Sequence, residues 1–193
     1  MVAFPNAKIN IGLDVTARRA NGYHDIETIF YPVSICDVLE VVEADLLTFT
    51  STGLEIPGTH DTNLCLKAYH LVRNDFDIPP VHIHLHKHIP IGAGLGGGSS
   101  NAAFFIKLLN DKFSLNLGFD AMEAYCRKLG ADCAFFIRNQ QVYAVGLGDE
   151  FTKITLDITP YQIILVKPPV HVSTGEAYRG VKPAKPMVSL VNS

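Results

Sequence analysis

The chain has 193 residues, of which 48% are hydrophobic and 18% are charged, and its formal net charge is -3. This length and apolar content suffice for one sizeable core, or for one large domain and part of a second. The small negative charge argues against nucleic acid or an anionic membrane as the main partner, because both attract basic surfaces. Any affinity for phosphate would therefore come from local geometry.

The sequence carries no signal for a membrane or for secretion. No apolar run approaches the about 20 residues that span a bilayer, and the first residues lack the basic and apolar regions of a secretory signal. The cysteines form no C-x-x-C pair and lie among apolar residues, which favours buried, reduced thiols in a cytoplasmic protein. These cysteines are Cys36, Cys65, Cys126 and Cys133.

The first predicted element is a half-buried strand over residues 7–15, where apolar and polar side chains alternate. Its apolar face is expected to hold Ala7, Ile9, Ile11, Leu13 and Val15, and its polar face Lys8, Asn10, Gly12 and Asp14. Further strands are predicted over residues 23–35, 38–43 and 46–51. Capping residues at 61–63 predict a helix that follows them.

The second half of the chain mixes predicted strands and helices. Strands are expected over residues 81–89, 141–145 and 161–166, and helices over 99–111, 118–130, 132–138 and from a capping box at 173–176. This irregular order predicts an α+β fold with a mixed sheet rather than a regular doubly wound one.

Histidines occupy alternate positions of the predicted strand over residues 81–89, so they share one face. Neighbours on that face lie roughly 6.5–7 Å apart, close enough in principle to share Zn²⁺. No cysteine or acidic residue nearby completes a ligand set, so a solvated polar face is favoured over a metal site. The histidines are His82, His84, His86 and His88.

A glycine-rich loop precedes the predicted helix over residues 99–111, and five of the seven residues from Gly92 to Gly98 are glycine. Glycine tolerates positive φ and has no Cβ, so consecutive N–H groups can face an anion. The helix directs its free N–H groups and positive dipole end to the same place. The loop is predicted to bind phosphate rather than to be a flexible linker. The predicted contacts are Pro90, Ile91, Gly92, Ala93, Gly94, Leu95, Gly96, Gly97, Gly98, Ser99 and Ser100.

This loop matches neither the P-loop, which needs a lysine after the glycines, nor the dinucleotide fingerprint, which needs a βαβ unit with a later acid. With four other segments, it resembles the ordered motifs of the GHMP kinase superfamily. The triple glycine and its Ser-Ser-Asn-Ala ending are most similar to the branch that phosphorylates a diphosphocytidyl-methylerythritol. The four segments are Ala7-Lys8-Ile9-Asn10-Ile11, Asn21-Gly22-Tyr23-His24, Leu129-Gly130-Ala131-Asp132-Cys133 and Gly146-Leu147-Gly148-Asp149.

The resemblance implies phosphoryl transfer from ATP, with Mg²⁺, to a hydroxyl of that substrate in the non-mevalonate isoprenoid route. It implies the N-terminal fold of these kinases, a ribosomal-protein-like domain with a mixed sheet and helices on one face. An ATP-binding domain is expected over residues 1–155 and the beginning of a second α+β domain over 156–193. The superfamily's third glycine-rich motif has no counterpart here, so the chain is expected to lack the C-terminal third.

The resemblance also implies a catalytic pair. Asp132 would orient the acceptor hydroxyl and accept its proton, although an aspartate after Gly130 could instead cap a helix. Ala134 stands where a proline often follows, which is expected only to loosen the backbone. Lys8 could pair with Asp132 or offset charge on the transferred phosphoryl, unless it is a solvated strand lysine. Asn10 shares the face of Lys8 and could bind substrate or orient the lysine.

Aromatic residues are implied to hold the cytosine. Tyr23 could stack on the base and His24 could hydrogen-bond its edge, although a hairpin aromatic and a surface histidine are the simpler reading. Tyr178 would close the other side of the base. Ser99 and Ser100 could contact phosphate or Mg²⁺ through their hydroxyls, with Ser100 the candidate metal ligand.

Two other functions fit the same motifs. A GHMP kinase for another small alcohol would not prefer cytidine at the Tyr23 and His24 pocket. A catalytically inactive ATP-binding fragment would bind the nucleotide without turnover. In each case the expected partners are ATP and a small molecule, with no nucleic acid and no membrane, in a monomer or homodimer.

Overall fold

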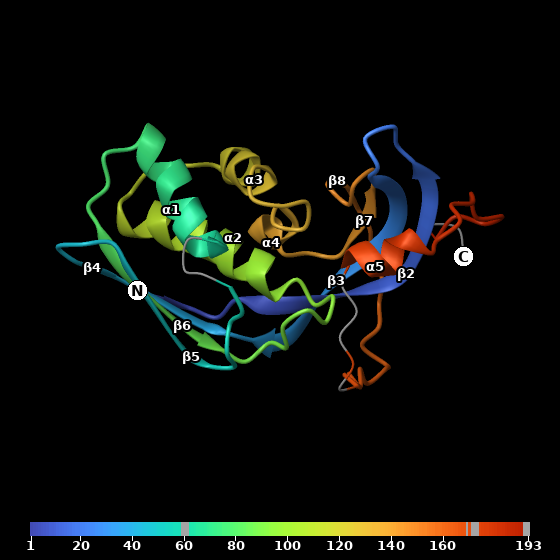
Figure 1. Ribbon diagram of the computed structural model, residues 1–193, viewed down its shortest axis with the longest axis horizontal. Coiled ribbons are helices and arrows are strands. Elements are labelled where there is room, and N and C mark those ends of the chain that lie inside the picture. The colour runs from blue at the N-terminus through green and yellow to red at the C-terminus, as the bar shows by residue number, and fades with distance from the viewer. Residues whose placement is uncertain (59–61, 169, 171–173, 191–193) are drawn as a thin grey trace.

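The protein is described from a computed structural model, which covers residues 1–58, 62–168, 170 and 174–190. It contains two four-stranded sheets and five helices among these residues (Figure 1). The α+β class is confirmed. The elements are β1 (Val2–Ala3), β2 (Asn6–Arg18), β3 (His24–Cys36), β4 (Val38–Glu43), β5 (Thr48–Gly53), α1 (Leu64–Asp75), β6 (Val81–Lys87), α2 (Gly97–Lys112), α3 (Phe119–Arg127), α4 (Phe135–Arg138), β7 (Val142–Val145), β8 (Glu150–Lys153) and α5 (Thr174–Arg179).

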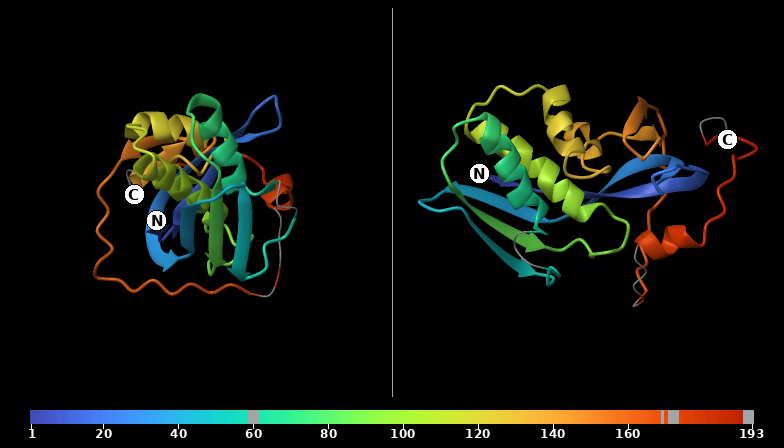
Figure 2. Two further views of the ribbon diagram at one scale, coloured as in Figure 1. Left: turned by 90° about the vertical axis from the view of Figure 1, so that its left-hand side faces the viewer. Right: turned by 45° about the horizontal axis from the view of Figure 1, so that its top comes forward.

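The mixed sheet has the strand order β1-β4-β6-β5, with β5 and β6 parallel and the other pairs antiparallel. Helices α1 to α4 lie on one side of it (Figures 1 and 2). Apolar side chains of β4 and β6, such as Leu39, Val41 and Ile83, are fully buried, as are Phe105 of α2 and Phe136 of α4. This layer is the main core, and it fixes α2 above the sheet.

The opposite face of the mixed sheet carries the predicted polar strand surface. Threonines of β5 and histidines of β6 alternate along a continuous hydrogen-bonded row, with oxygen–nitrogen distances from 2.7 to 3.2 Å. Hydroxyls thus contact both ring nitrogens of His82 and His84 and one of His86, while His88 lies beyond the end of β6. No group of three or more potential metal-binding side chains occurs in the described ranges. The row runs Thr48, His82, Thr50, His84, Thr52 and His86.

The antiparallel sheet has the order β2-β3-β7-β8. Its register shifts between Ile11 and Leu13, where Gly12 has φ +67°. One extra residue in a strand moves the side chains that follow it to the opposite face of the sheet. The expectation that Leu13 lies with Ile11 is therefore wrong, because Leu13 lines the same cavity as Lys8.

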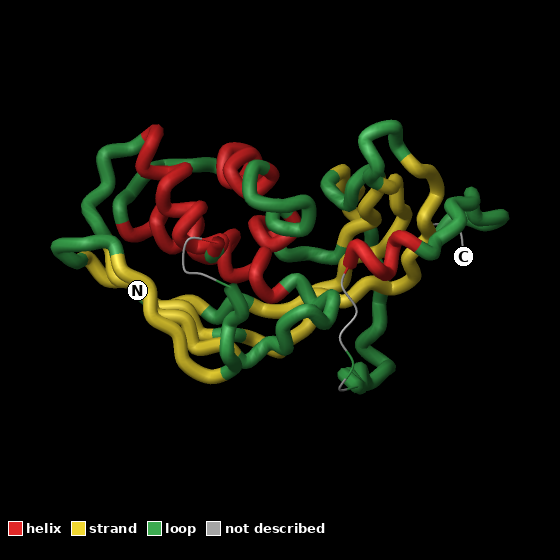
Figure 3. The backbone as a smooth tube through the Cα atoms, viewed as in Figure 1, coloured by secondary structure: helices red, strands yellow, loops and turns green. Residues whose placement is uncertain are grey.

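The chain from Ile154 to Pro168 forms loop and extended backbone (Figure 3) and runs around the outside of the sheets to reach α5 (Figure 2). The predicted strand at 161–166 is wrong, since none of the described strands pairs with it. Leu165 packs against a small core cluster, whereas Ile164 is 83% exposed. Helix α5 occurs where a last helix was predicted, but the proposed cap, Ser173, lies outside the described residues.

The last described segment returns to the antiparallel sheet. The Ala184 amide donates to the Val15 carbonyl at 3.0 Å. Leu190 lies so close to Gly12 that a Cβ there would come within 2.7 Å of it. Every helix in the described ranges is too short or too polar to cross a membrane.

Candidate active site

The glycine loop ends in a helix N-terminus with free N–H groups. Gly96 is the N-cap of α2 and has φ +68°, and no side chain caps the helix. The first helical hydrogen bond runs from the Ser100 amide to the Gly96 carbonyl at 2.8 Å. The amides of Gly97, Gly98 and Ser99 therefore have no intrahelical partner, as a phosphate cradle requires.

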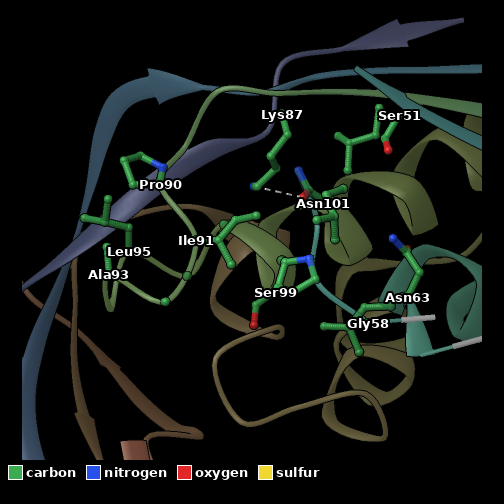
Figure 4. Close-up of a pocket in the computed structure, with 18 of the residues that line it drawn as sticks. Ser51, Gly58, Asn63, Lys87, Pro90, Ile91, Ala93, Leu95, Ser99 and Asn101 are labelled. Carbon is green, nitrogen blue, oxygen red and sulfur yellow. Dashed lines mark hydrogen bonds between the residues drawn. The ribbon is translucent and has the colours of Figure 1, made fainter. Parts of the chain in front are cut away.

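A cavity of about 440 Å³ lies against this loop. Ten of the predicted contacts, Pro90 through Ser99, line it. Residues of β5 and β6 and the N-cap of α1 also line it, including Ser51, Lys87 and Asn63 (Figure 4). Its size and mixed apolar and polar walls suit a nucleotide. We refer to it as the nucleotide cavity.

A buried ion pair supports the floor of the nucleotide cavity. Lys87 donates to Asp37, and both side chains are almost fully buried. The Asn101 amide donates to Asp37 at 2.8 Å and its oxygen accepts from Lys87 at 3.3 Å (Figure 4). Asp37 also accepts from the amides of His88 and Ile89 at 2.7 and 2.8 Å. This network joins the beginning of the loop to α2, so it fixes the cradle from both ends.

A second cavity of about 730 Å³ lies on the other side of the loop. Gly94 and Gly96 line both cavities. We call the second one the acceptor cavity. Its walls include Lys8 and Asp132, so the predicted catalytic residues lie next to the cradle.

Lys8 and Asp132 form an ion pair, with 3.3 Å between Nζ and Oδ2. We call it the reacting pair, because both residues are predicted to be catalytic. The Lys8 amine also donates to Asn10 Oδ1 at 2.6 Å and lies 4.7 Å from the centre of the Phe30 ring. Asn10 in turn donates to Thr28 Oγ1 at 2.9 Å. Lys8 is 4% exposed, so its charge is held in place by these contacts rather than by water.

The reacting pair is also tied to the cradle through the backbone. The Lys8 amide donates to the Leu95 carbonyl at 3.0 Å. Asp132 lies in the turn before α4, not within a helix as predicted, and its side chain is 34% exposed. A part-exposed carboxylate beside a buried ammonium can meet a hydroxyl that enters from the cavity.

The predicted base-binding rings lie together in the acceptor cavity. His24 and Tyr178 form the ring pair, stacked with centroids 5.2 Å apart and planes at 28°. Tyr23 lines the cavity nearby and is 64% exposed. Burial, with a smaller contribution from the charge of Asp132, raises the pKa of Tyr178. The structure thus brings the three residues to one place, but the rings of His24 and Tyr178 stack on each other.

The two serines after the glycines differ in their surroundings. Ser99 lines the nucleotide cavity. Burial raises the pKa of the neighbouring Cys133 thiol to about 11, although a hydrogen bond with Ser99 acts in the opposite direction. The Ser100 hydroxyl is buried with no hydrogen-bond partner among the described residues, and it lines neither cavity. A metal contact at Ser100 stays a prediction that needs this hydroxyl to become accessible.

Several site residues have no motif that marks them in the sequence. Asp37 and Lys87 meet only after folding, because they lie 50 positions apart. Asn63 was predicted as a helix cap, and its side chain accepts from the Cys65 amide at 2.8 Å. Its position in the nucleotide cavity was not predicted. Arg18 and Arg179 line the acceptor cavity and were also missed.

Comparisons with known proteins agree with this geometry. The GHMP kinases N terminal domain family matches residues 63–140, which contain the glycine loop and Asp132. The fold and the family match thus define a small-molecule kinase of the GHMP class, which uses ATP. The 4-diphosphocytidyl-2-C-methyl-D-erythritol kinase of Bacteroides fragilis is 50% identical over 194 residues, covering 98% of this chain and 71% of its own length. The chain belongs to the family of 4-diphosphocytidyl-2-C-methyl-D-erythritol kinases.

Further relatives support the assignment. The enzyme of the same name from Cytophaga hutchinsonii is 53% identical over 184 residues, covering 95% of this chain and 68% of its own length. A crystal structure of 4-(cytidine 5'-diphospho)-2C-methyl-D-erythritol kinase matches with a TM-score of 0.76 and 32% identity, covering 95% of this chain and 65% of that one. The mevalonate kinase of Methanococcus jannaschii, at 16% identity and a TM-score of 0.60, shares the fold.

Proposed function

We propose that this chain transfers the γ-phosphoryl group of ATP to a hydroxyl of 4-diphosphocytidyl-2-C-methyl-D-erythritol, in the non-mevalonate isoprenoid route and in the cytoplasm. The observation that carries the proposal is the position of the reacting pair in the acceptor cavity, across two shared glycines from the nucleotide cavity. Phosphoryl transfer needs mainly positioning and charge stabilisation, which this arrangement supplies.

In this proposal Asp132 hydrogen-bonds the acceptor hydroxyl and takes its proton as the oxygen attacks. The buried ammonium of Lys8, 3.3 Å from that carboxylate, orients it and offsets negative charge on the transferred group. Free amides at the start of α2 hold the phosphates. Gly97 has no Cβ, and an added Cβ would lie only 2.8 Å from the Lys87 amine.

Mg²⁺ is proposed to arrive with ATP. Mg²⁺ commonly uses one or two carboxylates together with substrate phosphates and water. Asp132 is the carboxylate that lines the cavity with Gly94 and Gly96, so the donors suit a metal carried by the nucleotide rather than a closed protein site. When bound, the ion would neutralise charge on the phosphates.

Tyr23, His24 and Tyr178 are proposed to bind the cytosine. Tyr23 is exposed and can stack on the base, while an imidazole nitrogen of His24 can hydrogen-bond its edge. Tyr178 reaches the opposite side only if the ring pair separates, because its ring now lies on His24.

The test is ADP release with ATP, Mg²⁺ and 4-diphosphocytidyl-2-C-methyl-D-erythritol. Asp132→Asn should lower kcat by about 10²–10⁴, the usual contribution of a general base. Asp157→Asn is the control, because Asp157 accepts from Thr159 at the surface and lines neither cavity. ATP binding without turnover by the unmodified chain would contradict the proposal and favour an inactive nucleotide-binding fragment.

A further inference from the structure

Two arginines line the acceptor cavity beside the ring pair. Arg18 ends β2, and its Cα lies opposite that of His24 in the register with β3. Arg179 ends α5 and directly follows Tyr178. Each arginine therefore adjoins one member of the ring pair, on a different element of the fold.

Neither arginine side chain has an ion pair or hydrogen bond with another described residue. Among the described residues that line the acceptor cavity, Asp132 supplies the carboxylate, and Lys8 already holds it at 3.3 Å. The cavity thus presents two guanidinium charges without a protein counter-ion, in a chain whose net charge is -3. Such uncompensated cations favour an anionic ligand.

A guanidinium offers planar, paired N–H donors that match phosphate oxygens. The proposed substrate has a diphosphate between its cytidine and its methylerythritol. The acceptor cavity has the ring pair and the reacting pair on its walls, and the arginines adjoin the ring pair. A diphosphate joined to a cytosine at the ring pair would therefore lie close to the two guanidinium groups.

We propose that Arg18 and Arg179 bind the diphosphate of the substrate and so select diphosphocytidyl compounds over plain cytidine or small alcohols. This proposal rests on the function proposed above. It assigns the two arginines a role in affinity for the acceptor and leaves proton transfer to Asp132.

Arg19 provides a matched control. It is adjacent to Arg18 and has the same side chain, but its guanidinium pairs with Asp25 at 2.6 and 2.7 Å. It does not line the acceptor cavity. Replacing Arg19 removes the same charge from the same turn without touching the proposed subsite.

The experiment measures, by calorimetry, the binding of cytidine and of cytidine diphosphate to the full chain and to Arg18→Gln, Arg179→Gln and Arg19→Gln. The unmodified chain should bind the diphosphate more tightly than cytidine. Arg18→Gln and Arg179→Gln should each weaken the diphosphate about tenfold, as expected for a charge-assisted hydrogen bond, and leave cytidine unchanged. Arg19→Gln should change neither.

Two results would overturn the subsite. Either the first two variants bind the diphosphate like the unmodified chain, or they lose cytidine and the diphosphate equally, which would mean a structural role. If the unmodified chain binds cytidine and cytidine diphosphate with the same affinity, the subsite is refuted but the proposed function is not. Failure of the unmodified chain to bind either ligand would contradict the proposed function, and the subsite with it.

Discussion

Gly96 belongs to both cavities, and its missing side chain allows them to meet. Its φ of +68° is unfavourable for any L-residue with a Cβ. A Cβ at this position would also come within 2.9 Å of Phe136 and 3.2 Å of Lys8. One residue therefore links the backbone of the cradle to the packing under the reacting lysine.

Gly96→Ala should destabilise the protein by about 1–2 kcal/mol for the left-handed backbone, with about 1–3 kcal/mol more for the overlap. Gly94→Ala is the matched control, because Gly94 has φ +72° but nothing within 4 Å of the added Cβ. Urea unfolding compares the two variants. Equal losses of stability would contradict a packing role for Gly96.

On the scale of the elements, Lys107 connects helices α2 and α4. It lies on α2 and donates to the Phe136 carbonyl of α4 at 2.7 Å, with its amine 4.3 Å from the Phe104 ring centre. Burial lowers the pKa of Lys107 from 10.5 to about 8. A four-residue helix has little stability of its own, so α4 depends on such contacts to position the turn that carries Asp132.

The lowered pKa of Lys107 predicts a pH dependence of stability. Between pH 8 and 10.5 the unfolded chain holds the Lys107 proton and the folded chain releases it, so this residue's contribution to stability rises with pH. The stability of the unmodified chain relative to Lys107→Met should increase across this window, by up to about 1.4 kcal/mol per pH unit. Denaturant unfolding at several pH values measures it.

Buried cysteines act in the opposite sense in the same experiment. Burial raises the pKa of the Cys65 thiol to about 12, so ionisation of the unfolded chain above pH 9 lowers stability. Both proteins in the comparison contain this thiol, so its contribution cancels in their difference. A difference that stays flat from pH 8 to 10.5 would show that the lysine is not perturbed by burial.

Local sequence patterns predicted most elements, and the exceptions have physical causes. The bulge at Gly12 could not be read from alternation, and it moves Leu13 to the other face. The apolar run at 161–166 has strand composition, but backbone pairing needs a neighbour that the described strands do not provide. The histidine face was predictable as polar, whereas its threonine partners depend on the parallel pairing of β5 with β6.

The same distinction holds for the site. The glycine loop was predicted to bind phosphate from its own sequence, and the roles of Lys8 and Asp132 were predicted from the family resemblance. The Asp37–Lys87–Asn101 network and the position of Arg18 and Arg179 in one cavity arise between distant segments, so no local pattern predicts them.

On the scale of the whole molecule, the glycine loop lies between the two cavities and connects the mixed sheet to α2. The chain spans about 70% of the length of its curated relatives and contains residues that line both cavities. A direct phosphoryl transfer requires nucleotide and acceptor to be bound at the same time, on opposite sides of Gly94 and Gly96.

Simultaneous binding is therefore the most direct test of this account. Cytidine diphosphate would be titrated calorimetrically into the chain saturated with Mg²⁺ and a non-hydrolysable ATP analogue. We expect one molecule to bind per chain with unchanged or increased affinity, because the ligands occupy separate cavities. An affinity that falls in proportion to the analogue concentration would mean that both compete for one site, and would contradict the two-cavity account.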